Sequence, residues 1–148
     1  MPTLLLRVAP LQNPERYAVL AHALTELTAR VLHKRREVTA VVIDDLPAAH
    51  WHIGGEPLNQ HTPQATAWLQ IDITAGTNTV DEKARFVAQA WAVLNHHLGQ
   101  GQLLAEASYV TVRELPATDW GYGGRTQAAR RVATTEAMAA TATETPAA

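Results

Sequence analysis

The sequence predicts a mixed α/β (α+β) fold of two tandem β-α-β units, with a four-stranded sheet and two helices on one face. Three observations predict it: strand and helix patterns alternate, their order occurs twice, and the two halves end in matching residues. The chain has 148 residues, the length of one domain. We expect this domain over 1–131, with repeats at about 2–55 and 67–126 and a linker at 56–66.

The first half contains a strand, a long helix and a second strand. Residues 3–9 place three leucines after a threonine and predict a buried strand. Asn13 and Pro14 suit the N-cap and the first position of a helix, whose apolar residues recur three and four apart as far as Val31. Residues 38–43 are apolar and β-branched with little alternation, which is typical of a strand covered on both faces.

The second half repeats this order of elements. Residues 68–74 alternate in polarity and predict a strand. Thr79 and Glu82 have the spacing of a capping box, which begins a helix. That helix is expected to end near Gly99, at a position that favours the left-handed conformation. Residues 107–113 predict the fourth strand.

Both halves end in the same pattern: Leu-Pro-Ala, a tryptophan three residues later, and then Gly-Gly. The pattern covers 46–55 with Trp51 and 115–124 with Trp120, without a gap. Agreement at that many positions indicates an internal duplication. Each unit is expected to pair its strands in parallel through a right-handed crossover. The sheet face without helices would then expose apolar side chains, so we expect self-association.

The end of the chain differs in composition from the two repeats. From residue 132 it is rich in alanine and threonine and has no aromatic residue. Such a segment has little apolar surface with which to pack against a core. We therefore expect 132–148 to be a disordered tail.

Composition excludes several classes of function. The 14 acidic and 12 basic residues give a formal net charge of −2, which provides no electrostatic reason to expect nucleic acid or an anionic membrane as partner. The absence of cysteine excludes disulfides and thiolate chemistry. No signal peptide or long apolar segment is visible, so a cytoplasmic location is expected by default.

Together these features resemble the 4-oxalocrotonate tautomerase family. The residues that carry the resemblance are Pro2 directly ahead of the first strand, the Leu-Pro-Ala turn, and the aromatic residue followed by Gly-Gly. Because both halves match, the resemblance covers about 2–126 and is to a fused, double-length member. It implies the tautomerase fold, a homotrimer and a keto–enol tautomerase activity.

The resemblance implies that Pro2 is the catalytic residue once Met1 has been removed. The exposed nitrogen is then a secondary amine, and α-amino groups have pKa values of about 7.7–8.0, which burial lowers. Such a base can move a proton between an enol oxygen and a carbon without a metal or an organic cofactor. In the second half the matching position is about Ala67, whose nitrogen is a peptide nitrogen, so one active site per chain is expected.

The aromatic position of the family falls at Trp51 and Trp120, which are expected to line a pocket and exclude water. The family's two substrate-binding arginines are not matched. In the first half the two arginine positions fall at Gln12 and Ala40, and in the second half at Thr77 and Tyr109. The usual dicarboxylate substrate of the family is therefore in doubt.

Another cation must then stabilise the dienolate of a small carboxylate substrate. The candidates are Arg7, Arg113 and Arg125; Arg113, at the end of the last strand, is preferred. Tyr109 could donate a hydrogen bond in place of a charge. His50 and His52 lack a third nearby ligand, so no metal site is expected.

Three hypotheses remain open. The first is keto–enol tautomerisation of a small 2-hydroxy-dienoate or 2-oxo acid. The second keeps Pro2 but assigns a hydratase, dehalogenase or decarboxylase reaction on a small unsaturated acid. Hydration needs a carboxylate to activate water, and Tyr122 at the expected position counts against it. The third is a catalytically inactive trimeric binding protein, because fold alone does not fix function.

Overall fold

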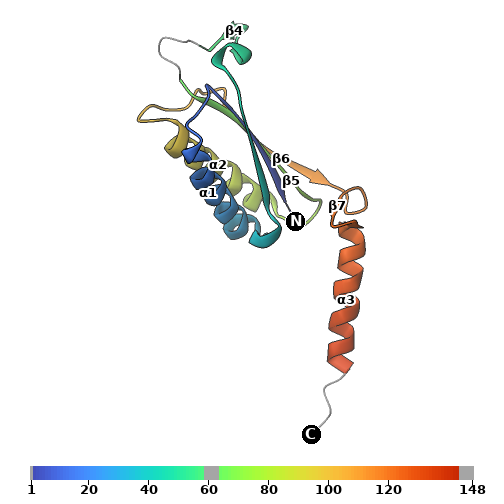
Figure 1. Ribbon diagram of the computed structural model, residues 1–148. Helices are drawn as coiled ribbons and strands as arrows, with labels where there is room; N and C mark the ends of the chain where they lie inside the picture. Colours follow the sequence, from blue (N-terminus) through green and yellow to red (C-terminus); the bar gives the residue numbers. More distant parts are fainter. Residues whose placement is uncertain (1, 59–63, 144–148) are drawn as a thin grey trace.

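The computed structural model describes residues 2–58 and 64–143 and contains a four-stranded sheet in the order β2-β1-β5-β6 (Figure 1). Two β-α-β units build it, one on each side of the junction between β1 and β5. The strands are β1 (Thr3–Ala9), β2 (Ala40–Asp45), β5 (Thr66–Thr74) and β6 (Tyr109–Leu115). The predicted α/β class and the tandem arrangement are confirmed.

Strand pairing follows the expected connections. β1 and β2 are parallel, and so are β5 and β6, because each pair is joined through a helix. The two units meet through the antiparallel pair of β1 and β5, in which Thr3 lies opposite Asp72 and Arg7 lies opposite Trp68. This register places the start of β1 and the start of β5 at opposite ends of the sheet.

Helices α1 (Glu15–Leu32) and α2 (Val80–Leu98) cover one face of the sheet (Figure 1). Alternate residues of β1 and β5 point to this face, and each helix contributes residues three and four apart. The core is almost entirely aliphatic, with Phe86 as its fully buried aromatic residue among those described. Its main members are Leu4, Leu6, Leu20, Leu24, Leu27, Leu69, Ile71, Ile73, Phe86 and Leu94.

Helix α2 starts as the sequence predicts, whereas α1 begins at Glu15 with Pro14 at the N-cap, one residue later than expected. Asn13 Oδ1 accepts a hydrogen bond from the Glu15 backbone N–H at 3.0 Å. The Thr79 hydroxyl accepts from the Glu82 N–H, and the Glu82 carboxylate accepts from the Thr79 N–H, which confirms the capping box. These bonds satisfy N–H groups that have no partner within the helix.

Several boundaries differ from the expectation. β2 begins at Ala40 and not at residue 38, because Arg36–Val38 form a short 3-10 turn, η1. β6 begins and ends two residues later than 107–113, and β5 begins two residues before residue 68. Gly99 has a right-handed φ of −69°, and the left-handed positions are Gln100 and Gly101. A side chain at Gly99 would overlap the Gln102 carbonyl oxygen, so this glycine is required by a close approach of the backbone.

A small hairpin follows each unit and was not expected from the sequence. Beyond the 3-10 turn η2 (Ala48–His50), β3 (His52–Ile53) pairs with β4 (Glu56–Pro57). In the second half β7 (Gly121–Tyr122) pairs with β8 (Arg125–Thr126). Both turns use the shared Gly-Gly pairs, all with positive φ, which glycine adopts without strain. The internal duplication therefore extends to the hairpins.

Helix α3 (Gln127–Thr143) follows the second hairpin and extends away from the sheet (Figure 1). The structure therefore corrects the expected disorder for 132–143, which are helical. The composition that suggested disorder is rich in alanine, the residue with the highest helix propensity. Residues 144–148 of the expected tail and 59–63 of the expected linker lie outside the described residues.

The face of the sheet opposite α1 and α2 carries both apolar and charged side chains. Val42, Trp68 and Tyr109 on this face are 57%, 41% and 59% exposed. Large apolar side chains on an uncovered sheet face favour association with other molecules, and the expected homotrimer remains a prediction. Within residues 2–58 and 64–143, no helix has the length and apolar character needed to span a membrane.

Candidate active site and a second cavity

Pro2 lies directly ahead of β1 and is buried. Its carbonyl oxygen accepts a hydrogen bond from the Ala40 backbone N–H at 3.3 Å, which ties the start of the chain to β2. The start of β1 lies at the end of the sheet where β6 leads into the β7–β8 hairpin and α3 (Figure 1). Met1, whose removal would expose the Pro2 nitrogen, lies outside the described residues.

An ion pair lies on the strands next to Pro2. Thr3 faces Asp72 on β5, and Asp72 faces Arg113 on β6. Arg113 Nε lies 2.8 Å from Asp72 Oδ1 and Nη2 lies 3.0 Å from Oδ2, a two-point contact. The hydrogen bonds and the charge of Asp72 raise the pKa of the Arg113 guanidinium, so its charge is permanent. The Arg113 side chain is 50% exposed and presents this charge on the uncovered face.

The β7–β8 hairpin adds an aromatic residue and a second arginine at the same end. A hollow of about 330 Å³ is lined by residues that include Trp120, Tyr122 and Arg125. Asp119 also lines this hollow, and its carboxylate accepts a hydrogen bond from the Thr118 hydroxyl at 2.6 Å.

Arg130 of α3 supports this hairpin, although the sequence indicated only a solvated side chain there. The Arg130 guanidinium lies 3.7 Å from the centre of the Tyr122 ring and donates to the Tyr122 carbonyl oxygen at 2.7 Å. Within the described part of the chain, three buried donor atoms find no partner: Trp120 Nε1, Gln127 Nε2 and Arg130 Nε.

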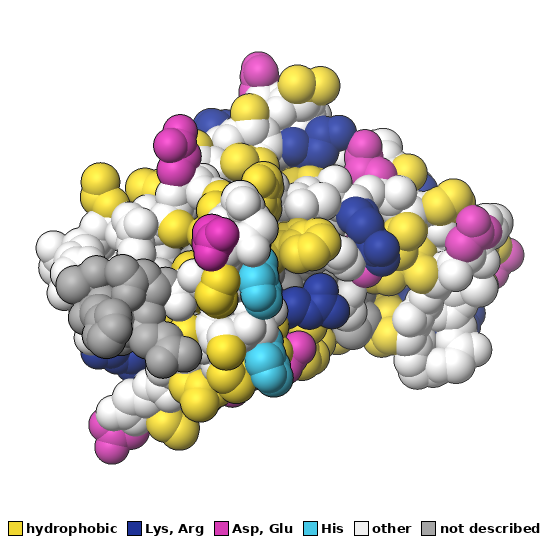
Figure 2. Space-filling view, turned by 90° about the horizontal axis from the view of Figure 1, so that it is seen from above, with side chains coloured by type: hydrophobic (Ala, Val, Ile, Leu, Met, Phe, Trp, Pro, Cys, Tyr) yellow, Lys and Arg dark blue, Asp and Glu magenta, His cyan; other side chains and the backbone are white. Residues whose placement is uncertain are grey.

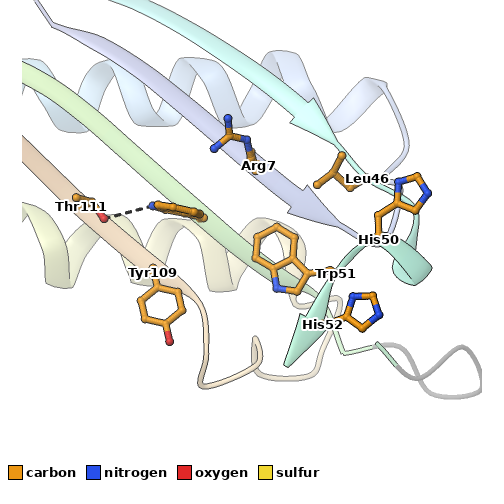
Figure 3. A pocket seen from close by; sticks show the side chains of 8 residues that line it. Arg7, Leu46, His50, Trp51, His52, Tyr109 and Thr111 are labelled. Atoms are coloured by element: carbon orange, nitrogen blue, oxygen red, sulfur yellow. Dashed lines mark hydrogen bonds between the residues drawn. The ribbon is translucent and has the colours of Figure 1, made fainter. Parts of the chain in front are cut away.

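A second cavity, of about 530 Å³, lies near the start of β5, on the uncovered face. Figure 3 shows Trp51 at its centre, between the sheet residues Arg7 and Tyr109 and the segment with His50 and His52. Seen from the β4 end of the molecule, histidine side chains lie beside hydrophobic and basic ones (Figure 2). The lining residues are Arg7, Leu46, His50, Trp51, His52, Trp68, Tyr109 and Thr111.

The polar groups of this cavity are weakly engaged by their neighbours. Arg7 Nε lies 3.7 Å from Asp44 Oδ2, at the long limit of an ion pair. The Arg7 guanidinium lies 5.8 Å from the centre of the Trp68 ring. Trp68 Nε1 donates to the Thr111 hydroxyl at 3.3 Å, which holds the indole in place.

The structure therefore divides the candidate residues between two ends of the sheet. Pro2, Arg113, Trp120 and Arg125 belong to one end, and Arg7, Trp51 and Tyr109 to the other. Ala67, at the position of Pro2 in the second half, lies next to Trp68, and its backbone N–H donates to the Ser108 hydroxyl at 3.2 Å. Trp68 and Thr111 were missed, although their outward-pointing positions on the strands could have indicated them.

The described residues contain no group of three His, Asp or Glu side chains placed to hold a metal ion. His50 and His52 lie at the second cavity and do not join such a group.

A family model described as tautomerase enzyme matches residues 6–60. The chain is also similar to solved structures of fused 4-OT, the abbreviation of 4-oxalocrotonate tautomerase. One, a wild-type asymmetric trimer named F6, has a TM-score of 0.74 at 26% identity, over 86% of this chain and 98% of that chain. A native fused 4-OT has a TM-score of 0.75 at 26% identity, over 86% and 97% of the two chains. These matches support a fused member of the 4-oxalocrotonate tautomerase family, since one polypeptide carries both β-α-β units.

The same fold occurs in proteins with other names. A member of the cis-3-chloroacrylic acid dehalogenase family matches with a TM-score of 0.69 at 24% identity, over 84% of this chain and 82% of that chain. None of the curated proteins matches this sequence. The likeness to tautomerases therefore leaves the reaction of this chain to be argued from its own site.

Proposed function

We propose that this chain is a tautomerase that catalyses keto–enol proton transfer on a small 2-hydroxy-dienoate or 2-oxo acid, with the Pro2 amine as general base. The observation that carries the proposal is the position of Pro2. It is buried at the start of the central strand β1, with β5 between it and Arg113 on β6, and it lies at the end of the sheet that carries Trp120. A base, a cation and an aromatic wall thus share one end of the fold.

The proton transfer needs a nitrogen that can both accept and return a proton near neutral pH. After removal of Met1, Pro2 is a secondary amine with one free lone pair. Burial disfavours the protonated form of an amine, so the buried position of Pro2 supports its role as the base that accepts the enol proton. The same nitrogen then delivers the proton to carbon as the ketone forms, so the reaction needs no cofactor.

The substrate carboxylate needs a cation at this end of the sheet. Arg113 is preorganised by Asp72, and a fixed charge stabilises a developing dienolate better than a mobile one. Arg125, which is exposed on β8, offers a second positive charge, and Trp120 supplies a flat surface for the conjugated part of the substrate. The proposed assignment is Pro2 as base, with Arg113, Arg125 and Trp120 as substrate-binding residues.

One observation favours the second candidate reaction, a Pro2-dependent hydration or dehalogenation. Asp119 lines the hollow with Trp120 and Arg125, and a carboxylate there could activate water. Asp119→Asn distinguishes the two reactions. It should leave tautomerisation active and abolish hydration of an acetylenic or halogenated acrylic acid.

The decisive test combines intact mass with an ultraviolet assay on phenylenolpyruvate. The mature protein should lack Met1, and Pro2→Ala should reduce turnover by about a hundredfold or more. Pro57→Ala is the matched control, because Pro57 is an exposed proline on β4 in the other hairpin. Circular dichroism confirms that both variants are folded. Retention of Met1, or equal turnover of the wild type and Pro2→Ala, would remove Pro2 from the mechanism and favour the inactive binding protein.

A further inference from the structure

We propose that the cavity around Trp51 is a second ligand site, which binds flat, conjugated or aromatic carboxylates and has no catalytic base. It is separate from the Pro2 end of the sheet, and its existence does not depend on the activity of Pro2. The proposal rests on the position of the cavity in the duplicated fold, on its aromatic lining and on its charge.

The cavity occupies the position in the second half that corresponds to the surroundings of Pro2. Trp51 matches Trp120 in the shared end pattern, and Ala67 replaces Pro2. The Ala67 nitrogen belongs to a peptide bond and donates to Ser108, so it has no lone pair with which to accept a proton. Duplication has thus left a site of the same type from which the base is missing.

Aromatic side chains give the cavity its shape. Trp51, Trp68 and Tyr109 come from three separate parts of the chain and line one space of about 530 Å³. Figure 3 labels Trp51 and Tyr109 among the residues that line it. Pockets of this size, mainly apolar with a few polar groups, are typical of small-molecule sites. Trp68 is fixed by its hydrogen bond to Thr111, so a flat ligand meets a preformed surface.

The charge of the lining favours an anion. One arginine, Arg7, lines the cavity, together with His50 and His52. The lining residues include no carboxylate. Asp44 engages Arg7 at 3.7 Å through one contact, whereas Asp72 holds Arg113 through two contacts of 2.8 and 3.0 Å. The Arg7 guanidinium therefore keeps N–H donors that can bind a ligand carboxylate.

The test is a titration of the full-length protein with trans-cinnamate, followed by calorimetry and by the NMR signals of the tryptophan indole N–H groups. Cinnamate should shift the indole signals of Trp51 and Trp68. Arg7→Gln should weaken this binding about tenfold or more, because it removes the charged partner of the carboxylate. Cinnamyl alcohol, which has the same ring and no charge, should bind as weakly to the wild type as cinnamate binds to Arg7→Gln.

Three further variants locate the binding. Arg35→Gln, on an exposed arginine paired with Glu37, should retain wild-type affinity. Arg125→Gln and Pro2→Ala change the other end of the sheet and should leave the shifts of Trp51 and Trp68 unaltered. Arg7→Lys keeps the charge without the planar fork and serves if Arg7→Gln fails to fold.

The outcomes separate clearly. Shifts of Trp51 and Trp68 that weaken in Arg7→Gln support the second site, whether or not the protein turns over phenylenolpyruvate. Shifts confined to Trp120 and sensitive to Arg125→Gln would place cinnamate at the Pro2 end and overturn the proposal. The absence of any shift up to about 10 mM ligand would overturn it as well.

Discussion

Arg113 and Asp72 join the parallel strands β5 and β6 through a two-point ion pair, directly across β5 from the residue that follows Pro2. The pair holds a permanent positive charge close to the proposed base. The Arg113 side chain is half exposed, so the role of the pair in stability and its role in binding can be separated by experiment.

Arg113→Gln should raise the KM for a 2-oxo acid substrate and lower kcat/KM by about tenfold or more, because the carboxylate and the dienolate lose a charged partner. The free energy of unfolding should fall by no more than about 1 kcal/mol, since exposed ion pairs contribute little. Steady-state kinetics and urea unfolding measure the two effects.

Arg35→Gln, which removes an exposed arginine paired with Glu37 and not with Asp72, provides the control for the change in net charge. A loss of stability in Arg113→Gln without a change in kcat/KM would make the pair purely structural.

Gly99→Ala should destabilise the protein more than Gly76→Ala. An added Cβ at Gly99 would overlap the Gln102 carbonyl oxygen and lie 2.6 Å from that of Asn95, so the backbone must move, at a cost of about 3 kcal/mol. At Gly76 the space is open and only the positive φ of 70° opposes the side chain, which costs about 1 kcal/mol. Thermal unfolding of both variants measures the order, and equal losses would contradict it.

Thr79→Ala should lower the free energy of unfolding by about 1 kcal/mol, because the Glu82 N–H at the start of α2 loses its acceptor. Thr79→Ser keeps the hydroxyl and should behave like the wild type. Chemical denaturation of the two variants checks the prediction. If Thr79→Ser were as unstable as Thr79→Ala, the methyl group and not the cap would be responsible.

Most elements of the fold could be predicted from local patterns in the sequence. The strand expected over 3–9 is present with those bounds, and the capping box at Thr79 forms as expected, because both depend on residues close together in the chain. β2 begins later than expected because Val38, the first residue of the expected strand, belongs to a 3-10 turn, which apolar composition does not reveal. The tail was misjudged because alanine supports a helix even where few apolar residues can pack.

The site was only partly predictable, because it depends on register between distant strands. Trp51 and Trp120 stood out through the repeat, but nothing in the sequence places Trp68 beside Arg7 or Asp72 beside Arg113. Those neighbours are fixed by the antiparallel pairing of β1 with β5 and the parallel pairing of β5 with β6. The same pairings separate the candidate residues into two ends of the sheet.

The last prediction concerns Tyr17, which connects α1 to the end of β2. Its hydroxyl donates a hydrogen bond to the Asp45 carboxylate. Burial, followed by the hydrogen bond and the charge of Asp45, raises the pKa of Tyr17 to about 12 from an ordinary value of 10.0. The folded protein therefore retains this proton at a pH where the unfolded chain has lost it. The stabilisation is complete below about pH 10 and is lost as the pH rises toward 12.

Tyr17→Phe should flatten this decline, because the variant has no phenol to titrate, and it should cost about 1 kcal/mol at neutral pH through the lost hydrogen bond. Asp45→Asn removes the charge but keeps an acceptor, so the Tyr17 phenol should then titrate at lower pH than in the wild type. Urea unfolding between pH 9 and 12, with tyrosinate absorbance read alongside, measures both effects. A wild type and a Tyr17→Phe variant with the same slope of stability against pH would show that Tyr17 is not the titrating group.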